Sequence, residues 1–265
     1  MNILVTGMSG LIGGVVRTRL ESQAELSALN RQPVHGIRTT QADLADYDAI
    51  RPAFDSQEVV VHLAAKAGEN FSWDELLQTN VVGTRNVLKA ADNAGCRRVI
   101  FASSGATVAG WEQVEPYKAL AEARYDDVPA EWSLIRHDMA TRPRGVYGAT
   151  KVWGEAIGRH YANTTAVSVL CIRIGYVNAA DRPSRPRDFA VWCSQRDIAE
   201  AIERCVFAPE ELKFDVLFAN SRNRWGYRDL THAEEAVGFV PRERRRTIAE
   251  PYSSESHWTD EPESA

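Results

Sequence analysis

The chain begins with the stretch Ile3-Leu4-Val5-Thr6-Gly7-Met8-Ser9-Gly10-Leu11-Ile12-Gly13, and an amphipathic pattern follows through Leu20. This order predicts a buried strand, a glycine-rich turn and a helix. In that context Gly7 permits a tight turn, Gly10 lets the backbone approach a pyrophosphate, and Gly13 lets the helix pack on the strand. The N-terminus of such a helix attracts phosphates through its free N–H groups and positive dipole. The stretch therefore favours a dinucleotide-binding fold over a turn that simply contains three glycines.

The remaining sequence alternates between strand and helix patterns. The run 59–65 is continuously apolar, as expected of a strand that is buried on both faces of a parallel sheet, and we interpret its His62 as a core histidine. The alternation predicts an α/β fold with one doubly wound parallel sheet, the Rossmann type. Further strands are expected at 26–29, 36–42, 98–104, 167–173 and 213–219, and helices at 73–94, 147–163, 196–205 and 227–237.

We expect a single Rossmann-type domain over 1–249. The segment 106–145 has no clear pattern beyond a short helix near 118–124, and a loop of that length is usually functional. It is predicted to form a flap over the substrate, and together with 176–249 a small C-terminal substrate lobe. The acidic tail 250–265 is rich in Ser, Glu and Asp and is expected to be disordered.

The composition limits the classes of function. The 265 residues carry a net charge of −5, so nothing indicates a nucleic-acid or membrane partner. No apolar run is long enough to cross a membrane, and the strand-like start leaves no room for a signal peptide. Four widely spaced cysteines and scattered histidines predict reduced, buried thiols and no metal site. These observations favour a cytoplasmic globular protein.

Tyr147 and Lys151 lie four residues apart at the start of a predicted helix, so their side chains share one face. A nearby ammonium favours the ionised phenol, and a tyrosine tuned in this way can exchange a proton with an alcohol or a carbonyl. Alone, the pair is weak evidence and favours a surface lysine beside a half-buried tyrosine. Ser104 ends a predicted strand at the edge where α/β proteins bind ligands, although serines there are also common helix caps.

The position after the second strand bears on cofactor choice. An acidic residue there would hold the adenosine ribose of NAD, whereas an arginine would accommodate the 2′-phosphate of NADP. The chain has Asn30 and Arg31, which favours NADP, with NAD as the alternative. Asp43 and Leu44 follow the third strand and are candidates for adenine contact.

Taken together, these motifs resemble the extended short-chain dehydrogenase/reductase family, also called the NAD(P)-dependent epimerase/dehydratase family. The resemblance rests on the TGxxGxxG motif from Thr6, the pair Asp43-Leu44, Asn80-Val-Val-Gly-Thr, the Ser104 strand end and the YxxxK motif, and covers residues 2 to about 241. Within the family the chain most resembles the branch of uronate dehydrogenase and archaeal-type glucose-6-phosphate dehydrogenase. Phe101-Ala-Ser-Ser104, Arg173-Ile174-Gly175 and Arg187 five residues before Trp192 carry that similarity.

The resemblance implies a Ser–Tyr–Lys mechanism, in which Tyr147 is the base, Lys151 lowers its pKa and holds the nicotinamide ribose, and Ser104 binds the reacting oxygen. Asn80 would help to position Lys151 or the active-site loop, and Arg187 would meet an anionic or polyhydroxyl part of the substrate. The implied cofactor-binding residues are Gly7, Ser9, Gly10, Leu11, Ile12, Gly13, Asn30, Arg31, Asp43, Leu44, Leu63, Ala64, Ala65, Asn80, Tyr147, Lys151 and Ile174, and the implied substrate-binding residues are Ser104, Gly105, Tyr176 and Arg187.

The chain also departs from uronate dehydrogenase. There the serine is followed by Asn-His, which touch the substrate, whereas Gly105-Ala106 follow it here. Tyr176 replaces a small residue, and 106–145 is longer. The expected activity is oxidation of a hydroxyl, the anomeric one favoured, of a free, acidic or phosphorylated sugar. The sugar itself, and the physiological direction, are left open.

Two other functions use the same fold. A sugar epimerase or dehydratase would use the same three residues but retain its cofactor. A non-catalytic NADP-sensing regulator is a third alternative, against which the intact Tyr147 and Lys151 argue. We also expect a homodimer, because the helices 73–94 and 147–163 carry apolar residues predicted to be exposed, namely Val87, Val152, Trp153 and Ile157.

Overall fold

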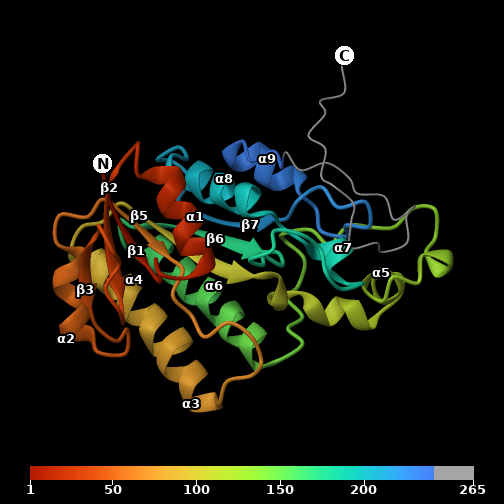
Figure 1. Cartoon of the computed structure of the whole chain (residues 1–265), viewed down its shortest axis with the longest axis horizontal. Coiled ribbons are helices and arrows are strands. Elements are labelled where there is room, and N and C mark those ends of the chain that lie inside the picture. The colour runs from red at the N-terminus through yellow and green to blue at the C-terminus, as the bar shows by residue number, and fades with distance from the viewer. Residues whose placement is uncertain (242–265) are drawn as a thin grey trace.

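A seven-stranded, wholly parallel sheet forms the centre of the molecule (Figure 1). This computed structural model describes residues 1–241, so the predicted tail 250–265 lies outside the described residues. The strands are β1 (Asn2–Thr6), β2 (Glu25–Asn30), β3 (Arg38–Gln41), β4 (Val59–His62), β5 (Arg98–Ser104), β6 (Ser168–Ile174) and β7 (Phe214–Ala219). Their order is β3-β2-β1-β4-β5-β6-β7, and it reverses direction between β1 and β4. The predicted doubly wound Rossmann fold is therefore confirmed.

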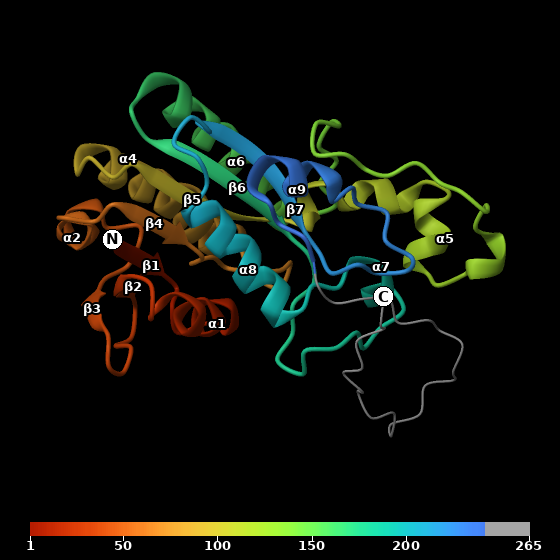
Figure 2. The same ribbon diagram turned by 90° about the horizontal axis from the view of Figure 1, so that it is seen from above.

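Helices cover both faces of this sheet. On one face lie α1 (Leu11–Leu20), α8 (Gln195–Val206) and α9 (Thr231–Val237), and on the other α2 (Tyr47–Ile50), α4 (Thr84–Asn93) and α6 (Val146–Thr164) (Figures 1 and 2). Alternate residues of each strand enter the two cores, because successive side chains of a strand point to opposite faces. Ile3 and Val5, for example, belong to one cluster of buried residues and Leu4 to the other.

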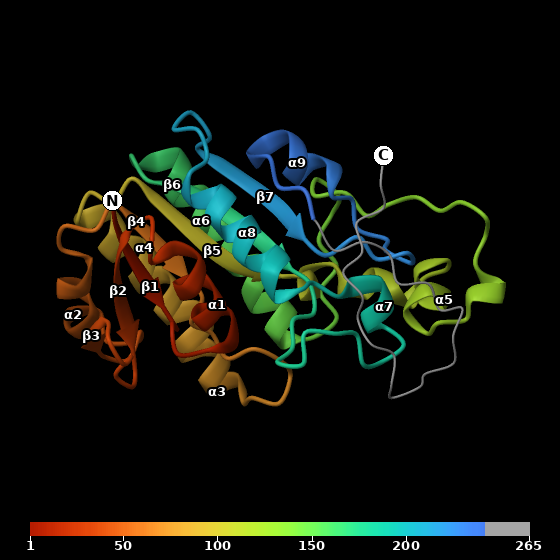
Figure 3. The ribbon, with the colours of Figure 1, turned by 45° about the horizontal axis from the view of Figure 1, so that its top comes forward.

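A third core lies beyond the carboxyl ends of the strands, where α5 (Tyr117–Ala121) and α7 (Asp188–Val191) project from the sheet (Figure 3). Its buried residues come from two stretches, 108–135 and 190–227. Short 3-10 helices, η3 (Gly105–Thr107), η4 (Ala109–Gln113) and η5 (Tyr125–Asp127), order the first stretch. These two stretches thus pack together, while the predicted lobe of 106–145 with 176–249 and its use for substrate stay predictions.

Two helix predictions need correction. The helix expected over 73–94 consists of α3 (Trp73–Leu76), a π-helical stretch η2 (Leu77–Gly83) and α4. The helix expected over 227–237 begins only at Thr231, because Tyr227 and Arg228 turn into the lobe, where both are buried. Val87, predicted to be exposed, lies fully inside the core beside the sheet. One part of the argument for a dimer is therefore wrong, and the dimer stays a prediction.

The predictions that His62 and the four cysteines are buried are confirmed. His62 is buried, and its two ring nitrogens contact the hydroxyls of Thr6 at 2.8 Å and Thr84 at 3.1 Å. Burial lowers the pKa of His62 to about 3, with a smaller contribution from the charge of Lys151, so it is a neutral core residue as predicted. All four cysteines are unpaired and buried, also as predicted. Within residues 1–241, no helix is both long and apolar enough to span a membrane.

Helix α6 lies unusually close to the sheet. A Cβ atom at Gly154 would collide with the Phe101 ring of β5, and one at Gly158 would lie 2.9 Å from the Val169 side chain of β6. Because both positions are glycine, the helix axis can approach the strands closely. This approach brings the first turn of α6, with Tyr147, to the carboxyl end of β5.

The opposite end of β5 is anchored by Arg98, whose side chain is almost completely buried. Its guanidinium donates to Ser168 Oγ at 2.9 Å, to the Ala208 carbonyl at 2.6 Å and to the Pro209 carbonyl at 2.7 Å. A fourth bond of 3.1 Å goes to the carbonyl of Cys205 in the last turn of α8. A cation placed there satisfies carbonyls that the end of a helix leaves unpaired.

We expect Arg98→Met to lower the free energy of unfolding by about 2–4 kcal/mol, because buried carbonyls lose their donors. Urea denaturation followed by circular dichroism measures the change. The control is Arg38→Met, since Arg38 is an exposed residue at the start of the edge strand β3. Equal stability of the two variants would contradict the proposed role of Arg98.

Candidate active site and cofactor site

The turn after β1 has the geometry that its glycines predict. Gly7 has a positive φ of 72°, and a Cβ atom there would lie 2.8 Å from the backbone nitrogen of Ala64. A Cβ atom at Gly13 would lie 2.5 Å from the carbonyl oxygen of Gly7. Neither position accepts a side chain without displacing backbone, so the turn and α1 pack as the dinucleotide-binding prediction requires.

The N-terminus of α1 has the properties of a phosphate site. Its N-cap, Gly10, provides no side-chain hydrogen bond to the first turn, and Ser9, Gly10 and Leu11 are exposed. At the end of β2, the side-chain oxygen of the buried Asn30 has no hydrogen-bond partner within residues 1–241. An uncapped helix start and an orphaned buried acceptor on neighbouring strands both fit a bound dinucleotide.

The other predicted cofactor residues surround this end of the sheet. Arg31 and Asp43 are exposed after β2 and β3, Ile12 is half-buried in α1, and Leu44 is buried. Leu63, Ala64 and Ala65 follow β4 directly, and the backbone nitrogen of Ala64 donates to Thr6 Oγ1 at 3.1 Å. Ile174 is the last residue of β6. All of these predicted residues therefore lie at or beside the carboxyl edge of the sheet.

Asn80 is buried within the π-helical stretch η2. Its side chain accepts a 2.8 Å hydrogen bond from the backbone nitrogen of Lys66, donates to the Lys66 carbonyl at 3.0 Å, and donates to Thr150 Oγ1 at 3.2 Å. It therefore joins the loop after β4 to the first turn of α6. π-Helical bulges are frequent at functional sites. Here the bulge places the Asn80 amide between the loop after β4 and the start of α6.

Ser104 and Tyr147 meet at the carboxyl end of β5. The Ser104 hydroxyl accepts a 3.1 Å hydrogen bond from the backbone nitrogen of Ala106 and so caps η3. Burial raises the pKa of Tyr147, hydrogen bonding from Ser104 lowers it, and the charge of Glu69 raises it. Glu69 also accepts a 3.3 Å hydrogen bond from the backbone nitrogen of Tyr147, and nothing in its sequence context marked it.

The expected lowering of the Tyr147 pKa by Lys151 stays a prediction. Burial dominates, and the net pKa of Tyr147 is raised. The Lys151 ammonium lies 5.9 Å from the centre of the Tyr147 ring and donates instead to the Ala102 carbonyl of β5 at 2.7 Å. Burial lowers the pKa of Lys151 to about 8, with small opposing contributions from Cys171 and Glu155.

A buried ion pair lies one helical turn beyond Lys151. Glu155 of α6 accepts two hydrogen bonds from Arg173 of β6, at 2.9 and 2.8 Å, and a third from the Ser103 hydroxyl at 2.5 Å. The bidentate geometry fixes both side chains and satisfies the carboxylate. This network joins α6 to the two strands whose ends form the site.

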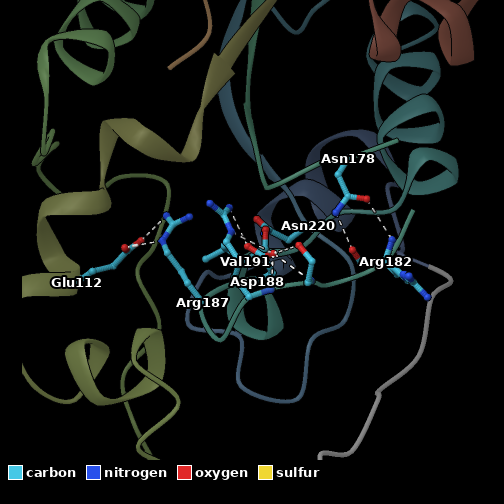
Figure 4. Close-up of polar contacts among 9 residues, drawn as sticks. Glu112, Asn178, Arg182, Arg187, Asp188, Val191 and Asn220 are labelled. Atoms are coloured by element: carbon cyan, nitrogen blue, oxygen red, sulfur yellow. Dashed lines mark hydrogen bonds and ion pairs between the residues drawn. The ribbon is translucent and has the colours of Figure 1, made fainter. Parts of the chain in front are cut away.

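Among the predicted substrate residues, Arg187 has a partner that the sequence did not reveal. Its guanidinium forms a bidentate pair with the buried Glu112, at 2.7 and 2.6 Å, and the two side chains face each other across the lobe (Figure 4). Glu112 also accepts a 2.6 Å hydrogen bond from the Tyr227 hydroxyl. The pair compensates the charge of Arg187, so its predicted role toward a substrate anion stays a prediction.

Two further predicted substrate residues, Gly105 and Tyr176, also lie at this edge. Tyr176 follows β6 and stacks against the guanidinium of Arg185, whose carbon lies 4.4 Å from the ring centre. Gly105 is buried and contacts Arg228, which reaches it from the segment between β7 and α9. The sequence placed Arg228 in a predicted helix and did not indicate that it lies at the site, because no motif marks an arginine there.

One group of potential metal ligands occurs in residues 1–241, comprising His137, Asp215 and His232, whose ligand atoms lie within 4.8 Å of one another. The two imidazole rings are stacked at 3.4 Å and nearly parallel, and His232 Nε2 contacts Asp215 Oδ1 at 2.8 Å. Nitrogens of parallel stacked rings do not converge on one tetrahedral ion. Asp215 also lies at the amino end of β7, away from Ser104 and Tyr147.

The whole of this site falls inside one match to known proteins. Residues 3–239 match the model of the NAD dependent epimerase/dehydratase family. The chain belongs to this family. It is therefore an NAD(P)-dependent enzyme of the extended short-chain dehydrogenase type, as the motifs from Thr6 to Lys151 predicted.

Several sugar dehydrogenases of this family are similar over nearly the full chain. L-Arabinose 1-dehydrogenase (NAD(P)(+)) of Haloferax volcanii is 31% identical over 94% of this chain and 99% of its own length. NAD-dependent glucose-6-phosphate dehydrogenase of the same organism is 28% identical over 91% of this chain and 93% of its own. The crystal structure of uronate dehydrogenase from Agrobacterium tumefaciens superimposes with a TM-score of 0.76 at 28% identity, covering 92% of this chain and 85% of that one.

We expect Gly13→Ala to weaken binding of NADH and NADPH by about tenfold or more, because the new methyl group displaces the turn that would receive the pyrophosphate. The matched control is Gly14→Ala in the same helix, where a Cβ atom meets nothing within 4 Å. The control should bind normally and gain up to about 1 kcal/mol of stability from helix propensity. Cofactor fluorescence titration and thermal unfolding measure the two effects, and unchanged binding by Gly13→Ala would refute the assignment.

Proposed function

We propose that this enzyme is a sugar dehydrogenase, which oxidises a hydroxyl group, the anomeric one favoured, of a simple sugar. The observation that carries the proposal is the meeting of Ser104, Tyr147 and Lys151 at the carboxyl edge of the sheet, next to the glycine turn. The similarity to arabinose, glucose-6-phosphate and uronate dehydrogenases supports a sugar as substrate.

In this proposal Tyr147 removes the proton from the sugar hydroxyl. Ser104 hydrogen-bonds the same oxygen and keeps it within reach of the phenol. The positive charge of Lys151, behind the ring, favours the phenolate as it forms. A nicotinamide cofactor held at the glycine turn after β1 would supply the acceptor for the hydride of the carbon that bears this hydroxyl. Lys151 is buried and Tyr147 is half-buried, and this limited access of water strengthens the electrostatic interactions on which the proton transfer depends.

The lobe argues for a dehydrogenase of small sugars over an epimerase of nucleotide sugars. An enzyme that holds a nucleotide and turns its keto-sugar over needs a large second lobe. Here the third core has only a few buried residues from 108–135 and 190–227. Its polar interior is also tied into internal pairs, such as Glu112 with Arg187. A compact substrate is the better fit.

The test follows reduced cofactor and product stereochemistry together, using a panel of aldoses, uronic acids and sugar phosphates. We expect NADH or NADPH to accumulate in proportion to the sugar consumed, and Tyr147→Phe to lower kcat by about 100-fold or more while cofactor still binds. Tyr161→Phe, at the far end of α6, is the matched control. An inverted sugar without net reduction of cofactor would establish an epimerase, and full activity of Tyr147→Phe would exclude that base.

We further propose a preference for NADP over NAD, supported by the exposed Arg31 after β2 and by the absence of a carboxylate at Asn30. The expected result is a higher kcat/KM with NADP, and a selective loss of NADP efficiency in Arg31→Ala of about tenfold. Arg51→Ala, exposed in η1 (Arg51–Phe54), serves as the control for a general loss of positive charge. Equal or better use of NAD by the wild-type enzyme would overturn the preference.

A further inference from the structure

Three arginines lie at or beyond the carboxyl ends of β5, β6 and β7, and they differ in how their charges are compensated. Arg173 is paired with Glu155, and Arg187 is paired with Glu112. Arg228 forms no ion pair within residues 1–241, although only 6% of it is exposed. A guanidinium stays protonated in a protein, so Arg228 contributes a buried positive charge. No carboxylate forms an ion pair with it in the described residues, although the charge of Glu112 acts on it from a greater distance.

The hydrogen bonds of Arg228 are also incomplete. Its two terminal nitrogens lie 3.4 Å from Asn220 Oδ1 and 3.4 Å from the Gly105 carbonyl, longer than the usual 2.7–3.2 Å of N–H···O bonds. Its Nε has no hydrogen-bond partner in the described part of the chain. Buried donors are normally satisfied, so this guanidinium is suited to an acceptor from outside the protein.

The position of Arg228 relates it directly to the predicted catalytic serine. A Cβ atom at Gly105, the residue after Ser104, would coincide with the guanidinium of Arg228. Arg228 therefore occupies the space that a side chain at 105 would take.

From these observations we propose that Arg228 binds an anionic group, a carboxylate or a phosphate, of the sugar substrate. This inference rests on the proposed sugar dehydrogenase function and narrows its substrate to acidic or phosphorylated sugars. Arg187 is the less suitable receptor, because Glu112 already takes two of its nitrogens and receives Tyr227 as well. Arg228 sets specificity and takes no part in the transfer of hydride or proton.

The first experiment compares sugars that differ mainly in charge, namely D-galacturonate against D-galactose and L-arabinose, and D-glucuronate and D-glucose 6-phosphate against D-glucose. For Arg228→Met we expect the KM of the anionic substrate to rise about 10- to 100-fold while the neutral sugars change little. Arg228→Lys should recover part of the loss. Arg222→Met, an exposed arginine of the same segment, should behave as wild type. The two anionic arms separate a carboxylate from a phosphate.

A second variant displaces the guanidinium without removing it. Gly105→Ala places a methyl group where the Arg228 guanidinium lies. In the wild-type background this substitution should raise the KM of the anionic substrate. In the Arg228→Met background it should not change that KM further. The thermal midpoint of Arg228→Met should stay level or rise, because removing an unpaired buried charge is not destabilising. An equal loss with acidic and neutral sugars, together with a lower midpoint, would show a structural role and overturn the proposal.

A binding measurement keeps this inference separate from the proposed function. D-Galacturonate and inorganic phosphate should raise the thermal midpoint of the wild-type enzyme but not that of Arg228→Met, whether or not any sugar is oxidised. If no sugar reduces the cofactor but the anions still raise only the wild-type midpoint, the anion site is supported and the dehydrogenase proposal is refuted. If sugars are oxidised but the anions raise the midpoints of both proteins equally, the role of Arg228 is refuted and the dehydrogenase proposal is supported.

Discussion

The close approach of α6 to β5 and β6 is the constraint on which the site depends. Glycines at 154 and 158 remove the side chains that would hold the helix away from Phe101 and Val169. At this separation the Lys151 ammonium donates to the Ala102 carbonyl at 2.7 Å. The buried pair of Glu155 and Arg173 then fixes the same helix to β6. Close van der Waals packing thus sets the distance of α6 from the sheet, and the polar network fixes the position of α6 along β5 and β6.

The same edge of the sheet concentrates positive charge in a medium of low dielectric. Lys151 and Arg228 are both buried without a carboxylate partner in the described residues, whereas Arg173 and Arg187 have one. Desolvation lowers the pKa of Lys151 and that of Arg228, which indicates the strain of holding these charges away from water. Such strain is retained in proteins where a bound partner relieves it. The anionic substrate group proposed above would be such a partner.

Local motifs were sufficient to predict the architecture. The turn from Gly7 to Gly13 and the apolar run 59–65 determine a parallel sheet because their backbone requirements are met within a few residues. The core role of His62 was predictable for the same reason. The partners of Arg187 and Arg228 were not, since Glu112 and Gly105 are more than 70 residues away along the chain. Long-range pairing depends on how the lobe folds, and no periodicity encodes it.

The pKa of Tyr147 shows a further limit of sequence reasoning. The spacing of Tyr147 and Lys151 correctly predicts a shared helix face, but not the depth at which that face lies. Burial raises the pKa of Tyr147, and Glu69, remote in sequence, adds to the effect. Spacing along a helix determines the direction in which the side chains point, whereas burial and neighbouring charges determine their pKa values.

The connection between β5 and α6 has an evolutionary consequence. Segment 106–145 begins just after Ser104 and ends just before Tyr147. Its first residues, Ala106 and Thr107, hydrogen-bond Ser104, but the backbones of Ser104 and Tyr147 belong to β5 and α6 and not to this segment. Its length and sequence can therefore drift while the reacting groups keep their positions. Selection for a new sugar can act on this insertion as a replaceable module, with the hydride chemistry inherited unchanged.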